Sequence, residues 1–200
     1  MIVSKSRKFV FAHIPKTGGI SIRTALEPYA DGQLAVTRET THETLPQFLS
    51  RHPEAGDFFK FAFVRNPWDR LVSFYFFAKD VLGRTIPEIG KVDGLNGMLR
   101  AADAGAPWIR DLHIMRPQRD FLRGADGENL SDFTGRFERL PEDFAAVCTR
   151  LGIETPRLGR RNAFPHPAYA QCYDDWSKGF VAERYRGDIE AFDYRFEAAA

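Results

Sequence analysis

The sequence lacks several features that would assign it to a class by themselves. It has only two cysteines, Cys148 and Cys172, in 200 residues, and their spacing fits neither a metal site nor a disulfide framework. No apolar run approaches the roughly 20 residues that cross a bilayer, and residues 1–8 lack a signal-peptide core. The 28 basic and 27 acidic side chains leave a net charge of +1, without the basic excess typical of nucleic-acid binders. We therefore expect a cytoplasmic protein that neither spans a membrane nor binds nucleic acid.

An alternation of strand and helix patterns predicts a single α/β domain over residues 1–200. Apolar runs predict strands at 8–14, 58–64 and 133–138 with a short one near 33–37, and amphipathic segments predict helices at 19–28, 43–50, 67–79, 141–151 and 175–190. This order favours a central parallel sheet flanked by helices, a three-layer sandwich. Residues 83–108, rich in Gly, Asp and Ala, interrupt the pattern, so we predict an insertion or lid there.

The strongest functional signal is a glycine-containing loop between the first predicted strand and helix. It reads His13-Ile14-Pro15-Lys16-Thr17-Gly18-Gly19-Ile20-Ser21. Glycine lets backbone N–H groups approach an oxyanion, and the first turn of a helix offers unpaired donors and the positive end of its dipole. Lys16 adds a cation, and Thr17 and Ser21 add hydroxyls. The loop therefore predicts a binding site for a phosphate-like group.

The residue order in this loop differs from that of a Walker A loop. In a Walker A loop the lysine follows the last glycine, whereas here Lys16 precedes Gly18 and Gly19. The sequence also offers no apolar strand ending in aspartate as a Walker B partner. A magnesium-dependent nucleotide hydrolase is therefore disfavoured.

A second strand-to-helix junction carries Arg65 and Ser73. Arg65 follows an apolar run, Asn66 is a good helix N-cap, and Pro67 suits the first helical position. Ligands of open parallel sheets bind at the carboxyl ends of the strands, so the Arg65 guanidinium can face a phosphate there, with the Ser73 hydroxyl beside it. Two anion sites at two strand ends predict a ligand with two separated anionic groups.

Both segments resemble motifs of the sulfotransferase family. Residues 16–21 look like the loop that binds the 5′-phosphosulfate, and residues 65–73 look like the motif that binds the 3′-phosphate. Weaker similarity continues through Pro117-Gln118, residues 135–138 and residues 185–194. The closest resemblance is to the branch that includes carbohydrate 2-O-sulfotransferases and small bacterial homologues. It implies a P-loop-like fold and a metal-independent transfer of a sulfuryl group from 3′-phosphoadenosine 5′-phosphosulfate (PAPS) to an acceptor with a free hydroxyl, such as a saccharide or a small molecule.

The resemblance also implies roles for individual residues. The donor's 5′ end would be held by Lys16, Thr17, Gly18, Gly19, Ile20 and Ser21, and its 3′-phosphate by Arg65 and Ser73. Lys16 would also be catalytic, because it would stabilise the charge on the departing phosphate. Arg160, Arg161 and Asn162, by their position in the family, would fold across the bound nucleotide.

His42 is the candidate catalytic base. It matches a catalytic histidine that related carbohydrate sulfotransferases carry after their first helix. The surrounding Thr40-Thr41-His42-Glu43 resembles a capping box, which would place the imidazole in the first turn of a helix. A helix N-terminus disfavours imidazolium, so the ring would stay neutral and able to accept a proton.

The sequence leaves two other functions open. A kinase-like phosphotransferase would use the same loop for ATP and would require magnesium rather than a 3′-phosphate. A non-catalytic module would bind the bisphosphate product without turnover. His42 has the alternative interpretation of a surface histidine at a helix start, and no motif indicates the acceptor or the oligomeric state.

Overall fold

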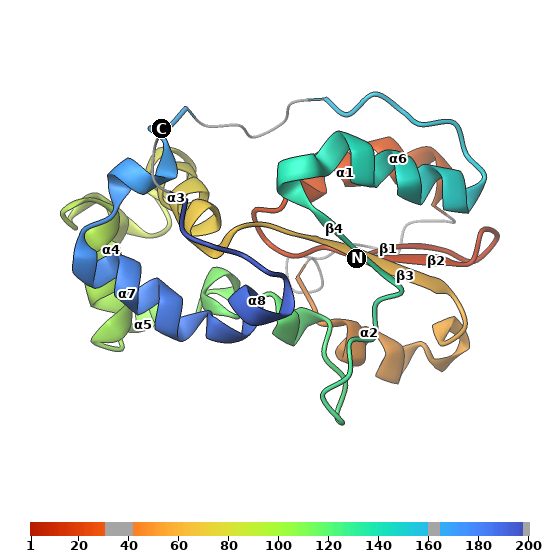
Figure 1. Cartoon of the computed structure of the whole chain (residues 1–200), viewed down its shortest axis with the longest axis horizontal. Coiled ribbons are helices and arrows are strands. Elements are labelled where there is room, and N and C mark those ends of the chain that lie inside the picture. Colours follow the sequence, from red (N-terminus) through yellow and green to blue (C-terminus); the bar gives the residue numbers. More distant parts are fainter. Residues whose placement is uncertain (31–41, 160–164, 198–200) are drawn as a thin grey trace. The chain divides into compact units, whose positions relative to one another are not determined.

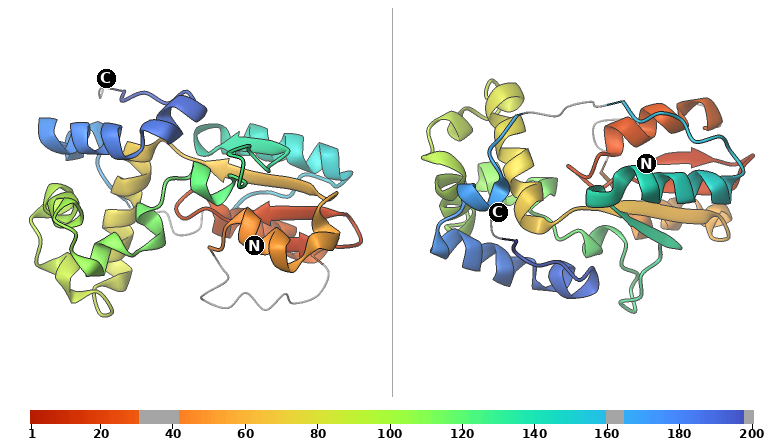
Figure 2. Two further views of the ribbon diagram at one scale, coloured as in Figure 1. Left: turned by 90° about the horizontal axis from the view of Figure 1, so that it is seen from below. Right: turned by 45° about the horizontal axis from the view of Figure 1, so that its top comes forward.

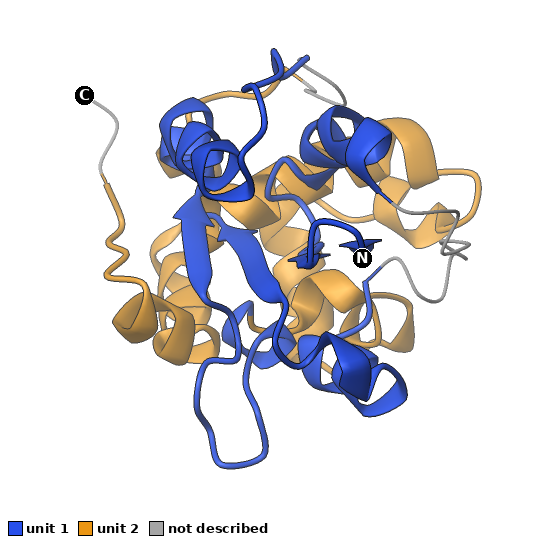
Figure 3. Cartoon of the chain, turned by 90° about the vertical axis from the view of Figure 1, so that its right-hand side faces the viewer, with its two compact units in different colours: residues 1–65, 118–161 blue, residues 66–117, 162–200 orange. Residues whose placement is uncertain are grey.

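The computed structural model describes residues 1–30, 42–159 and 165–197, which form two compact units (Figure 3). The first unit comprises residues 1–65 and 118–161, and the second comprises residues 66–117 and 162–200. Each unit is assembled from two separate stretches of the chain. That all 200 residues fold as one domain stays a prediction.

The first unit is built on a four-stranded sheet with the order β1-β2-β3-β4 (Figure 1). The strands are β1 (Ile2–Ser4), β2 (Phe9–Ala12), β3 (Phe59–Val64) and β4 (Phe133–Arg136). β2, β3 and β4 run parallel to one another, whereas β1 pairs with β2 in the antiparallel direction. The predicted α/β class with a central, mostly parallel sheet is therefore confirmed, and the sheet is mixed because of β1. The strand predicted near 33–37 lies outside the described residues.

Helices cover both faces of this sheet. They are α1 (Gly19–Leu26), α2 (Leu45–Arg51) and α6 (Leu140–Leu151). Figures 1 and 2 show α1 and α6 on one side of the sheet and α2 on the other, which gives the predicted three layers. Alternate phenylalanines of β2 and β3 form a buried cluster with apolar side chains of α1 and α6, namely Phe9, Phe11, Phe61, Phe63, Ile22, Leu26, Phe144 and Val147. Burial of such apolar surface is the main stabilising contribution to the layer contact.

The second unit is helical in its described residues. Its helices are α3 (Pro67–Phe77), α4 (Gly94–Asp103), α5 (Pro107–Arg110), α7 (Asp175–Arg184) and α8 (Arg186–Ala191). α3 begins as predicted, since the Asn66 side chain accepts a hydrogen bond from the Trp68 N–H and Pro67 occupies the first position. α4 arises within the predicted insertion, and its Leu95, Met98 and Leu99 are buried in the core of this unit. A lid function for residues 83–108 stays a prediction.

The single C-terminal helix predicted over 175–190 is wrong, because α7 and α8 are separated at Tyr185. This residue has non-helical dihedral angles, with φ −108° and ψ 22°. Its buried hydroxyl lies 3.4 Å from the carbonyl oxygens of Ile114 and Met115 and donates to this pair. Tertiary contacts of the Tyr185 side chain therefore accompany the break. None of the helices in the described ranges is long and apolar enough to cross a bilayer.

Candidate active site

The loop between β2 and α1 adopts a backbone shape suited to an anion. Lys16 has a φ of 66°, and Gly18, the N-cap of α1, has a φ of 81°. A left-handed conformation is uncommon for lysine, and strained backbone of this kind clusters at functional sites. Left-handed residues in such turns direct successive N–H groups toward one point, where an anion can bind. Within the described chain no side chain caps α1, and its first turn contains no acidic residue.

The two glycines of the loop are packed tightly against neighbouring side chains. A Cβ atom on Gly18 would lie 2.9 Å from Leu140 Cδ2, and one on Gly19 would lie 2.0 Å from Cδ2 of His13. The first contact comes from α6 and the second from the end of β2. A Cβ at position 19 would therefore require the His13 ring to move, whereas one at position 18 would meet the flexible end of Leu140 in a backbone conformation that L side chains rarely adopt.

Two cations lie together at this loop. The Arg65 guanidinium, at the end of β3, donates from Nη1 to the Lys16 carbonyl oxygen at 3.4 Å. Burial of the ammonium and the like charge of Arg65 lower the pKa of Lys16 to about 8. Both causes disfavour the charged form, and a bound anion would act in the opposite direction. The arrangement is therefore electrostatically suited to a ligand with negative charge.

Arg65 is held by two residues that come later in the chain. Its backbone N–H donates to Gln118 Oε1 at 2.9 Å, and Gln118 Nε2 donates back to the Arg65 carbonyl oxygen at 2.8 Å. The Arg65 side chain, 7% exposed, lies over the Phe137 ring with its Cζ atom 4.1 Å from the ring centroid. Sequence analysis noted Gln118 and Phe137 only as parts of the resemblance and did not assign them this role.

The two loop hydroxyls are used inside the protein. The fully buried Thr17 hydroxyl donates to the carbonyl oxygen of Ile14 at 3.0 Å, so it braces the loop. The Ser21 hydroxyl donates to the carbonyl oxygen of Gly159 at 2.6 Å. In this arrangement the donor group that Thr17 can offer to an anion is its backbone N–H. Ile20 is 41% exposed on the first turn of α1.

His42 is oriented by the backbone just after β2. Its Nδ1 atom lies 3.1 Å from the carbonyl oxygen of His13. A carbonyl oxygen only accepts, so Nδ1 carries the proton, and in the neutral ring Nε2 is then the atom able to accept one. The imidazole rings of His42 and His13 also meet edge to face, with centroids 4.7 Å apart.

The predicted helical position of His42 is wrong. α2 begins at Leu45, and its capping box is formed by Thr44 and Gln47 rather than by Thr40 and Glu43. His42 therefore lies two residues before the N-cap, where the carbonyl of His13 rather than a helix dipole fixes its orientation. Thr40 itself lies outside the described residues.

His13 packs between the loop and His42. Its side chain is 5% exposed, and burial first, then the charge of His42, lowers its pKa well below the usual value. Its Nδ1 atom has no hydrogen-bond partner in the described part of the chain. A neutral, packed ring agrees with a structural role for this residue.

The remaining predicted residues belong to the second unit or lie outside the described residues. Ser73 is on α3 of the second unit and is partly buried, and a shared phosphate site with Arg65 stays a prediction. Arg160, Arg161 and Asn162 lie outside the described residues.

Comparison with known proteins identifies the family of the chain. The sequence model of the sulfotransferase family matches residues 1–195. This one match includes the loop between β2 and α1, Arg65, Ser73 and nearly all of both compact units. No curated protein and no solved structure matches the chain. Because the family model covers almost the whole sequence, the chain belongs to the sulfotransferase family.

Proposed function

We propose that the protein transfers a sulfuryl group from PAPS to a hydroxyl of an acceptor, with a carbohydrate as the candidate acceptor. Family membership supports sulfotransfer in general. The observation that carries the choice of donor is the pair of cations, Lys16 and Arg65, beside the left-handed turn at the N-terminus of α1. The repulsion between two neighbouring positive charges is offset when a multiply charged anion binds to them. PAPS supplies such an anion.

The proposed reaction is an in-line displacement at sulfur. The acceptor oxygen bonds to sulfur while the bond from sulfur to the bridging phosphate oxygen breaks, which leaves negative charge on the departing phosphate. The Lys16 ammonium and the N–H groups at the start of α1 stabilise that charge. His42 Nε2 takes the proton of the acceptor hydroxyl, and the ring becomes imidazolium.

Calorimetry with adenosine 3′,5′-bisphosphate tests the donor site. We expect the bisphosphate to bind more tightly than ADP with magnesium or adenosine 5′-monophosphate. Arg65→Ala should weaken bisphosphate binding roughly 10- to 100-fold, because hydrogen bonds to charged groups contribute about 1.5–3 kcal/mol. The same variant should remove the preference for bisphosphate over monophosphate, because Arg65 is proposed to bind the 3′-phosphate.

Arg139→Ala is the matched control, since this exposed arginine belongs to the same unit and pairs with Asp143 at 3.5 Å. It should leave the affinity unchanged. A preference for ADP with magnesium would instead support the kinase-like alternative. Tight bisphosphate binding by a protein that transfers no sulfuryl group to any acceptor would support the non-catalytic module.

Bisphosphate binding should also be linked to a proton at Lys16. In the free protein the pKa of Lys16 is about 8, and a neighbouring phosphate raises it. Binding near pH 8 should therefore take up a fraction of a proton, and affinity should fall as pH rises above that value. Calorimetry in buffers with different ionisation enthalpies measures the uptake. Lys16→Arg should make affinity independent of pH in this range, because arginine stays protonated. Equal proton uptake by this variant would contradict the assignment to Lys16.

A further inference from the structure

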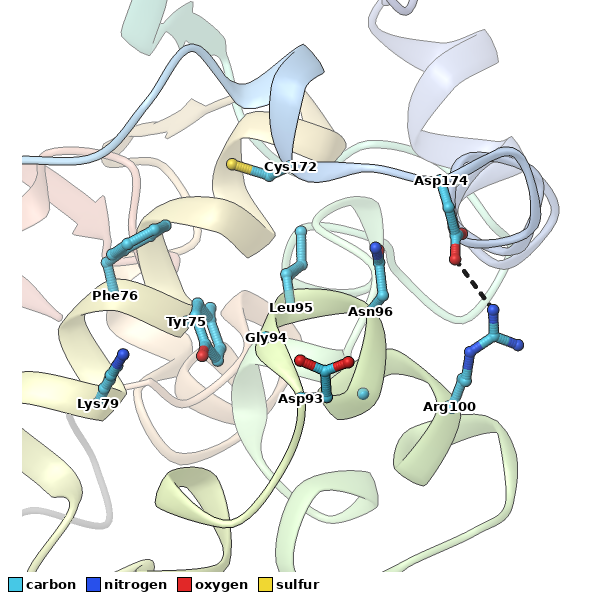
Figure 4. Close-up of a pocket in the computed structure, with 11 residues that line it drawn as sticks. Tyr75, Phe76, Lys79, Asp93, Gly94, Leu95, Asn96, Arg100, Cys172 and Asp174 are labelled. Carbon is cyan, nitrogen blue, oxygen red and sulfur yellow. Dashed lines mark hydrogen bonds and ion pairs between the residues drawn. The ribbon is translucent and has the colours of Figure 1, made fainter.

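The second unit contains a pocket whose lining includes residues 93–97 of the predicted insertion (Figure 4). Its volume is about 570 Å³, within the roughly 300–1,000 Å³ of ordinary small-molecule sites. It lies among the end of α3, the start of α4 and the segment before α7. The residues used below are Tyr75, Phe76, Lys79, Asp93, Asn96, Arg100 and Asp174.

The charged groups of the pocket balance. Arg100 and Asp174 form an ion pair, with Nη2 and Oδ2 2.9 Å apart, and the Arg100 guanidinium also lies over the Trp176 ring at 4.3 Å. Lys79 and Asp93 supply one positive and one negative charge, and neither forms an ion pair in the described part of the chain. Figure 4 shows them on either side of Tyr75. A lining with two cations and two carboxylates has no net charge, so it attracts neither cationic nor anionic ligands as a class.

The pocket lining has both hydrogen-bond donors and hydrogen-bond acceptors that a ligand can contact. Asn96 Oδ1 is buried and has no hydrogen-bond partner among the described residues. The Asp93 carboxylate caps no N–H of α4 within the described chain, although Asp93 is the N-cap residue. Asp93 and Lys79 are exposed, so their carboxylate and ammonium can exchange bound water for the donor and acceptor groups of a ligand, and the Asn96 side chain lines the same pocket. A hydroxyl group can serve as either.

Aromatic side chains provide the apolar part of the lining. Tyr75 is 6% exposed, and Phe76 packs against His166 with ring centroids 5.7 Å apart. Tyr75 also contacts the edge of Phe76, with centroids 5.3 Å apart. Flat apolar surface beside a few fixed polar groups matches a ring that has apolar C–H faces and hydroxyls at its rim.

We propose that this pocket binds an uncharged saccharide ring of the acceptor, with Asp93, Asn96 and Lys79 contacting its hydroxyls. The identification of the ligand as an acceptor rests on the proposed sulfotransfer, whereas the binding does not. The lining carries no net charge, so saccharides with a net charge, such as uronates and amino sugars, gain no electrostatic advantage there.

Saturation-transfer NMR on the full-length protein without donor tests the pocket. The probes are the neutral disaccharides maltose, cellobiose and lactose, together with glucuronate and glucosamine. We expect at least one neutral disaccharide to bind more tightly than both charged sugars. Asn96→Leu, Asp93→Ala and Lys79→Met should each weaken its binding about tenfold, the effect of one lost hydrogen bond. Asp103→Ala, an exposed position of α4 outside the lining, should leave it unchanged.

Absence of binding by all three neutral disaccharides, tighter binding of a charged sugar, or unchanged affinity in the three pocket variants would each overturn the proposal. Lys79 and Asp93 are exposed, so their variants are expected to fold. Bisphosphate affinity of each variant checks that the protein is intact. Since no donor is present, failure of saccharide binding leaves the donor site untouched. Failure of sulfotransfer likewise leaves the binding result standing.

Discussion

Replacing His42 by alanine is expected to lower kcat for sulfuryl transfer roughly 10²- to 10⁴-fold, the usual contribution of a general base. The physical reason lies in the hydrogen bond of its Nδ1 atom to the His13 carbonyl oxygen at 3.1 Å. That bond leaves Nε2 as the proton acceptor of the neutral ring. Because His42 is proposed to act on the acceptor's proton, the affinity for adenosine 3′,5′-bisphosphate should change less than about twofold. Initial rates with PAPS and a saturating acceptor, beside calorimetry of the same variant, measure both quantities.

His52→Ala is the control for this experiment. His52 lies just after α2, stacks on Phe48 with centroids 4.7 Å apart and has its Nδ1 atom 3.3 Å from a Glu54 carboxylate oxygen. Its variant should keep both the rate and the affinity. A His42→Ala protein with full kcat would show that another group removes the proton. Loss of bisphosphate affinity together with rate would instead indicate that His42 supports the loop.

The strand-to-helix junctions could be predicted because their signals are local. Asn66 and Pro67 start α3 as expected, and the glycines at 18 and 19 start α1, because caps and turns depend on a few adjacent residues. The helical position of His42 was mispredicted for a related reason. Thr40 and Glu43 have the spacing of a capping box, but Thr44 and Gln47 have the same spacing and form the actual one.

The support of Arg65 could not be predicted from local patterns. Its backbone pairs with a glutamine 53 positions away in the sequence, and its guanidinium lies over Phe137. No periodicity or motif chemistry indicates which distant side chain will meet a given strand end. The three-residue strand β1 was missed because so short a segment shows no alternation. The pocket beside α4 likewise depends on three segments that meet only in the folded chain.

Replacing Lys16 by methionine is expected to lower kcat about 10²- to 10³-fold, the usual effect of removing one group that stabilises developing charge. Methionine keeps much of the side-chain length and replaces the ammonium with an uncharged thioether. The left-handed backbone at this position, with φ 66°, is equally demanding for lysine and methionine. The loss of rate therefore reports the missing charge rather than added strain.

Lys16→Arg separates charge from geometry at the same position. Arginine stays protonated at every working pH, whereas the pKa of Lys16 is about 8 in the free protein. If charge alone is required, Lys16→Arg should recover most of the rate lost in Lys16→Met and should keep kcat/KM constant between pH 7 and pH 9, where the native enzyme declines. If the compact ammonium must reach the bridging oxygen, Lys16→Arg should bind the bisphosphate yet remain as slow as Lys16→Met. Full activity in Lys16→Met would show that the N–H groups at the start of α1 stabilise the departing phosphate without Lys16.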